Sequence, residues 1–65
     1  MKRMFRVTDR VSGQVSAHIE AGNGKAALRK FLRSFTASGL YEIRKEDGLW
    51  TLTSSYGSWF TAERV

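Results

Sequence analysis

Residues 23–38 read NGKAALRKFLRSFTAS, and this stretch decides the fold because its apolar residues recur with the period of a helix. At 100° per residue they fall within one arc of about 140°; they are Ala27, Leu28, Phe31, Leu32 and Phe35. Asn23 suits the N-cap, where its side chain accepts a hydrogen bond from a free backbone N–H. Gly39 suits the left-handed residue that closes a helix. The stretch therefore predicts one amphipathic helix.

The other side of this helix is cationic and contains no acidic residue; it carries Lys25, Arg29, Lys30 and Arg33. Like charges at the i, i+4 spacing of Lys25, Arg29 and Arg33 destabilise a helix by about 0.2–0.5 kcal/mol per pair. The chain as a whole has a net charge of +5. The row indicates either a solvated basic face or a face that binds an anionic partner, and both interpretations stay open at this point.

Alternating sequences before the helix predict two strands. Residues 3–9 alternate through Phe5 and Val7, and residues 14–20 alternate in the same way. The residues between the two runs are turn formers, and we expect a positive φ at Gly13. The two strands should form a β-hairpin.

The C-terminal part predicts three more strands. Asp47-Gly48 lies between alternating runs and is typical of a two-residue hairpin turn. A turn there gives one self-consistent register: Ile43 with Leu52, Lys45 with Trp50, Arg44 with Thr51 and Glu42 with Thr53. Lys45 would then form a cation–π contact with Trp50, worth about 0.5–1 kcal/mol. A further turn over residues 54–58 leads to a last strand over residues 59–64.

These elements predict a single α+β domain over residues 1–65, in the order ββαβββ, with a mainly antiparallel sheet and the helix packed on one face. Because Phe5 and Val7 should face the helix, Arg6 should lie on the opposite, open face. That face should also carry Ser16, His18, Arg44, Thr51 and Thr53, together with Trp59 if Phe60 and Ala62 point inward. An aromatic ring in such surroundings suits base stacking, a dimer interface or simple solvation.

The leading functional hypothesis is a small basic protein that binds nucleic acid and has no catalytic activity. Its phosphate contacts would come from Lys25, Arg29, Lys30 and Arg33, with Lys2, Arg3 and Arg6 as an auxiliary arm. Phosphate contacts position a protein, whereas base contacts give it specificity. Binding should therefore be weakly sequence-selective, and the partner could be DNA or RNA.

The alternative hypothesis is a protein-binding module or inhibitor, of the kind that phages and mobile elements encode. It would dock on an acidic protein surface or add a strand to a partner's sheet, and the last predicted strand is the edge that we expect to be uncovered. A homodimer is a further alternative, because a domain of this size buries only about 60% of the surface of its unfolded chain. The chain also has no cysteine to form a stabilising disulfide.

The sequence favours neither catalysis nor a bound cofactor or metal. His18 is the only histidine, and no serine, cysteine or carboxylate stands at a spacing that would form a nucleophilic or metal site with it. No apolar run approaches the roughly 20 residues that span a bilayer. The start of the chain lacks the apolar segment of a secretory signal. We therefore expect a cytoplasmic protein that does not enter a membrane.

Overall fold

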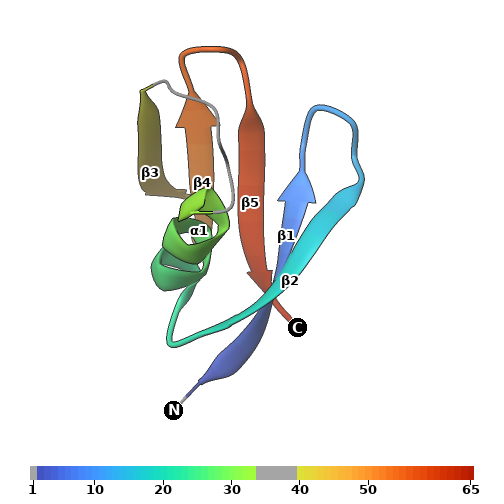
Figure 1. The fold of residues 1–65 in the computed structure, drawn as a ribbon, viewed down its shortest axis with the longest axis vertical. Coiled ribbons are helices and arrows are strands. Elements are labelled where there is room, and N and C mark those ends of the chain that lie inside the picture. Colours follow the sequence, from blue (N-terminus) through green and yellow to red (C-terminus); the bar gives the residue numbers. More distant parts are fainter. Residues whose placement is uncertain (1, 34–39) are drawn as a thin grey trace.

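The computed structural model describes residues 2–33 and 40–65, which form a five-stranded antiparallel sheet with one helix on one face (Figure 1). The elements are β1 (Arg3–Asp9), β2 (Val15–Ala21), α1 (Gly24–Arg33), β3 (Tyr41–Glu46), β4 (Leu49–Ser54) and β5 (Trp59–Arg64). The predicted α+β class and the order ββαβββ are confirmed. The predicted last turn of the helix, over residues 34–38, and the closing Gly39 lie outside the described residues.

The strands are arranged in the order β2-β1-β5-β4-β3, with every neighbouring pair antiparallel. The prediction that the last strand lies at an uncovered edge is therefore wrong. β5 is the central strand, between β1 and β4, and its consecutive residues Phe60, Thr61 and Ala62 are all buried. The helix-side core includes Phe60 and Ala62, whereas Thr61 lies on the open face between its strand neighbours Thr8 and Thr51, which an edge strand would not have on both sides. The edges of the sheet are β2 and β3.

The two predicted hairpin turns have the expected backbone. Gly13 has a φ of 80°, and the turn between β3 and β4 has positive φ at both Asp47 (52°) and Gly48 (77°). Positive φ at both central residues defines a type I′ turn, whose twist matches that of the flanking strands. The four predicted β3–β4 pairs all occur, including Ile43 with Leu52 and Lys45 with Trp50.

The core lies between the sheet and α1, which contacts all five strands (Figure 1). Leu28 on the helix and Leu52 and Val7 on the sheet are completely buried. The rings of Phe31 on α1 and Phe60 on β5 meet edge to face, with centroids 5.0 Å apart. This edge-to-face contact joins the helix to the central strand of the sheet.

The start of α1 is determined by Asn23 and Gly24. The backbone N–H of Ala26 donates a hydrogen bond of 2.8 Å to Asn23 Oδ1, so the predicted N-cap is confirmed. Gly24 is buried directly against Trp50 of β4, where an added Cβ would lie 2.6 Å from Trp50 Cδ1. Only a residue without a side chain lets the helix begin this close to the sheet.

Candidate nucleic-acid interface

The two sides of the sheet differ in charge, and the strand registers determine which side each charged residue occupies. Arg64 lies opposite the buried Phe5, and Lys45 lies opposite Trp50, which packs against the core. Arg3 follows the same alternation as Phe5 and Val7. The side of the sheet that α1 covers, here called the helix side, therefore carries these cations: Arg3, Lys45 and Arg64 from the strands and Lys25, Arg29, Lys30 and Arg33 from α1.

Among residues 2–33 and 40–65, one acidic residue has a helix-side register: Asp9, the last residue of β1, lies opposite the buried Phe60, and its carboxylate accepts hydrogen bonds from the backbone N–H groups of Val11 and Ser12 in the turn. All of the glutamates alternate onto the opposite, open face of the sheet; they are Glu20, Glu42, Glu46 and Glu63. The other aspartate, Asp47, lies in the turn between β3 and β4. The sequence of residues 34–39 contains no charged side chain. The molecule is therefore cationic on one side and mixed to acidic on the other.

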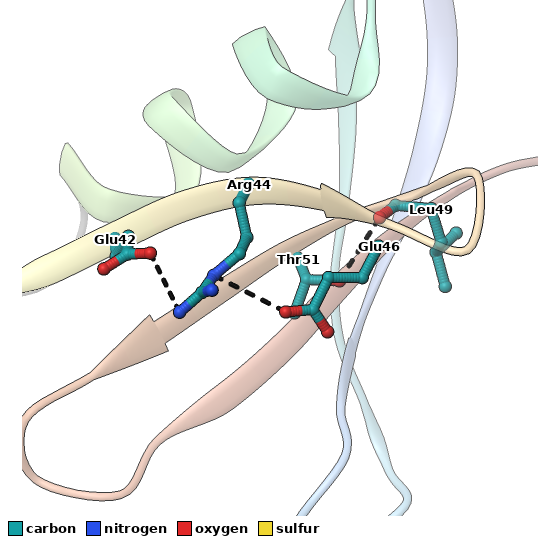
Figure 2. Close-up of polar contacts among 5 residues, drawn as sticks. All are labelled: Glu42, Arg44, Glu46, Leu49 and Thr51. Atoms are coloured by element: carbon teal, nitrogen blue, oxygen red, sulfur yellow. Dashed lines mark hydrogen bonds and ion pairs between the residues drawn. The ribbon is translucent and has the colours of Figure 1, made fainter.

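Two cations of the open face, Arg6 and Arg44, are paired with glutamates. Arg6 forms an ion pair with Glu63 of β5. Arg44 lies between two glutamates of its own strand, 2.8 Å from Glu42 Oε1 and 3.5 Å from Glu46 Oε1 (Figure 2). These groups are about half exposed, so the pairs contribute at most about 1 kcal/mol each to stability. Their main effect is to neutralise the positive charge on this face.

Arg6 thus lies where the alternation predicted, on the open face opposite His18. Its position separates it from the helix cations, so the proposed auxiliary arm is divided. Arg3 is on the helix side, opposite Ala21 of β2, and the exposed Lys2 precedes it. The Nζ of Lys30 donates a 2.6 Å hydrogen bond to the carbonyl oxygen of Glu20, the neighbour of Ala21. Arg3 and Lys30 therefore meet at the same end of the sheet.

The cations of α1 fall into a crest and two flanks. Arg29 and Arg33 are exposed on the side of the helix opposite the buried Leu28 and Phe31, and the described structure gives neither an acidic partner. Lys30 lies on the flank towards β2, where it binds the Glu20 carbonyl. On the other flank, Lys25 lies over Trp50, with its Nζ 5.9 Å from the ring centroid.

Sequence reasoning missed Lys45 and Arg64 as members of the cationic side. Lys45 Nζ lies 5.9 Å from the same Trp50 ring, which it faces across the β3–β4 hairpin. Arg64 follows Phe60 and Ala62 in the alternation of β5, so the orientation of that strand would have revealed it. Both residues extend the cationic surface of α1 onto the sheet.

The open face has an aromatic residue of its own. Phe60 and Ala62 are buried, so Trp59 faces the open side as predicted, with 44% of its surface exposed. The guanidinium of Arg10 lies 5.8 Å from its ring centroid. His18 is exposed on the same face. Within the described residues, no group of three histidine, cysteine or acidic side chains is arranged to hold a metal ion.

Comparison with known proteins supplies no relative, so the function has to be inferred from the fold and from these residues. No protein-family model, no curated protein and no solved structure matches this chain. Among the described residues, α1 is too short and too polar to cross a membrane.

Proposed function

We propose that this protein binds nucleic acid through its helix side, with Arg29 and Arg33 contacting phosphates. The observation that supports this proposal is the separation of charge between the two sides of the sheet. In the described structure, the helix side has cations from α1 and three strands and a single acidic residue, Asp9 at the end of β1, while every glutamate lies on the open face. A phosphate backbone approaching α1 would meet the exposed cations Arg29 and Arg33, with the glutamates on the opposite side of the sheet.

The contacts of the individual cations refine the proposal. Lys30 is engaged by the Glu20 carbonyl and Lys25 lies over Trp50, whereas Arg29 and Arg33 occupy the exposed crest of α1. A guanidinium can form two parallel hydrogen bonds to a phosphate, which suits these two arginines to the role. Arg3 and Arg64 would add electrostatic attraction near the Lys30 flank. This composition fits binding that depends on charge and only weakly on base sequence.

The edge strands support the competing hypothesis of a protein partner less well. β3 carries a mixture of charges, Glu42, Arg44, Lys45 and Glu46, and charged edges discourage the addition of another strand. At the other edge, the Nζ of Lys30 donates a hydrogen bond to the carbonyl oxygen of Glu20 in β2, and an added strand would have to compete for that oxygen. An acidic protein surface would still attract the same cations, so the experiment includes one.

The test is a fluorescence anisotropy titration with labelled duplex DNA, single-stranded DNA and RNA at several salt concentrations. If about four phosphates are contacted, the slope of log K against log salt should be close to −3 to −4. The Arg29→Gln/Arg33→Gln variant should lower the affinity and make this slope shallower by about 2.

The open face provides a matched control. The Arg6→Gln/Arg44→Gln variant loses the same charge from the opposite side of the sheet and should bind like the parent protein. Equal losses in the two variants would show that net charge, not the helix side, determines binding. An absence of binding at low salt would refute the proposal, and tighter binding to polyglutamate than to an oligonucleotide of equal charge would favour an acidic protein partner.

A further inference from the structure

One large aromatic side chain lies within the cationic surface of the helix side. Trp50 is half-buried on β4, and the ammonium groups of Lys25 and Lys45 each lie 5.9 Å from its ring centroid. One lysine comes from the start of α1 and the other from β3. Trp50 thus lies between two cations of the helix side.

The ring of Trp50 is fixed by its surroundings. Its Cδ1 edge lies against the backbone of Gly24, so closely that no Cβ would fit between them. Its own strand is paired on both sides, with Lys45 of β3 and with Ala62 of β5. A ring that is already immobilised loses little conformational entropy when a ligand stacks on it.

We propose that Trp50 stacks on an unpaired nucleobase, so that the helix side prefers single-stranded nucleic acid to a duplex. This inference rests on the proposed function and specifies its substrate. Stacking on an aromatic side chain needs a base whose face is free, which an intact duplex does not offer. Lys25 and Lys45 would leave the ring as the base arrives and would bind the phosphates on either side of it. Stacking accepts any base, in agreement with the weak sequence selectivity expected from the phosphate contacts.

Trp59 is the more exposed of the two tryptophans, but its surroundings fit a nucleic acid less well. It lies on the open face, on the same side of the sheet as all of the glutamates. A strand stacked on Trp59 would bring its phosphates towards Glu63 and Glu46 and away from α1. Trp59 therefore serves as the matched control for Trp50.

The first experiment uses the fluorescence of Trp50 alone, in a Trp59→Phe variant that leaves it as the only tryptophan. We expect its emission to be quenched on titration with an oligomer of about twelve thymidines, a length within the range of known single-strand sites. A duplex of the same length should leave the emission nearly unchanged. Binding of the single strand with no change in Trp50 emission would overturn the inference while leaving the proposed function in place.

The second experiment compares Trp50→Leu with Trp59→Leu. Loss of base stacking at Trp50 should reduce the affinity for the single strand by about fivefold or more, with less than a twofold effect on the duplex. The salt dependence should not change, because the phosphate contacts remain. Trp59→Leu should bind like the parent protein.

Because Trp50 packs against the core, a Trp50→Phe variant is included, which keeps a ring and most of the packing. This variant keeps an aromatic ring at position 50, so it should retain the preference for the single strand. It also provides a folded comparison if Trp50→Leu proves unstable. A preference that survives in a folded Trp50→Leu variant, or equal losses for single strand and duplex, would refute the stacking role. Failure of the parent protein to bind any nucleic acid would refute this inference together with the proposed function.

Discussion

Replacing Gly24 by alanine tests the close approach of α1 to the sheet. The added Cβ would lie 2.6 Å from Trp50 Cδ1, 3.0 Å from Cγ and 3.1 Å from Cβ. The last of these atoms is attached to the backbone of β4, which is paired on both sides, so rotating the ring cannot remove every contact. Trp50, α1 or both must shift to accommodate the methyl group.

The expected cost is the difference between two effects. Overpacking of a tightly filled site costs typically about 1–3 kcal/mol. Alanine recovers at most about 1 kcal/mol over glycine in a helix. We therefore expect Gly24→Ala to lower the free energy of unfolding by about 1–2 kcal/mol, which for a domain of this size lowers Tm by roughly 5–15 °C.

The assay is thermal and urea denaturation followed by circular dichroism, with Gly22→Ala as the matched control. Gly22 is two residues away and does not have a positive φ, and a Cβ added there would meet no atom within 4 Å. Alanine at Gly22 should leave Tm unchanged or raise it slightly, by reducing the entropy of the unfolded chain. In a Trp50→Leu background, the cost of Gly24→Ala should shrink, because the two side chains no longer overlap. A Gly24→Ala protein as stable as the Gly22→Ala protein would refute the reasoning.

Two further predictions concern the N-cap and the core. Asn23→Ala removes the acceptor of the Ala26 N–H and should cost about 1 kcal/mol in urea denaturation, whereas Asn23→Asp should retain most of that stability; equal losses would argue against the cap. Leu52→Ala empties a completely buried position beneath α1 and should cost about 2–5 kcal/mol. A domain of this length is stable by roughly 3–10 kcal/mol, so Leu52→Ala should remove a large part of that stability and lower Tm by about 8 °C or more. A cooperative transition with an unchanged Tm would contradict the assignment of Leu52 to the core.

Local features of the fold were predictable from the sequence because nearby residues determine them. Asp47-Gly48 accepts positive φ at both turn positions, and a two-residue turn leaves one register for β3 and β4. Asn23 is an N-cap because its own side chain reaches the backbone three residues later. Neither result depends on the rest of the molecule.

The position of β5 was not predictable in the same way. Its pairing with β1 joins residues far apart in the sequence, Phe5 with Arg64, and no turn between these strands specifies it. Three consecutive residues of β5 are buried, as expected for a central strand. The sequence does not show that Thr61 is buried, because the residues beside it belong to β1 and β4. Long-range pairing is chosen by the packing of the whole sheet.

The candidate site was predicted in part. Helical periodicity identified Arg29 and Arg33 as outward-facing, and the structure leaves both exposed. The periodicity could not show that Lys30 turns back to Glu20 or that Lys25 lies over Trp50, since these contacts involve strands outside the helix. Arg64 belongs to the cationic surface because of the side of the sheet that it faces in β5, which helical periodicity does not address.

The central position of β5 has a consequence for how the chain folds. β1 with β2, and β3 with β4, are each local hairpins, and two-stranded hairpins are at best marginally stable in water. The two hairpins become one sheet only when β5, which follows both of them in the sequence, inserts between them. The pairing of β5 with β1 joins residues that are far apart in the sequence. Such long-range pairing slows folding compared with a protein of similar size and mostly local contacts. Until residues 59–64 have left the ribosome, the apolar side of α1 has no complete sheet to cover it, so this domain should not finish folding before they emerge.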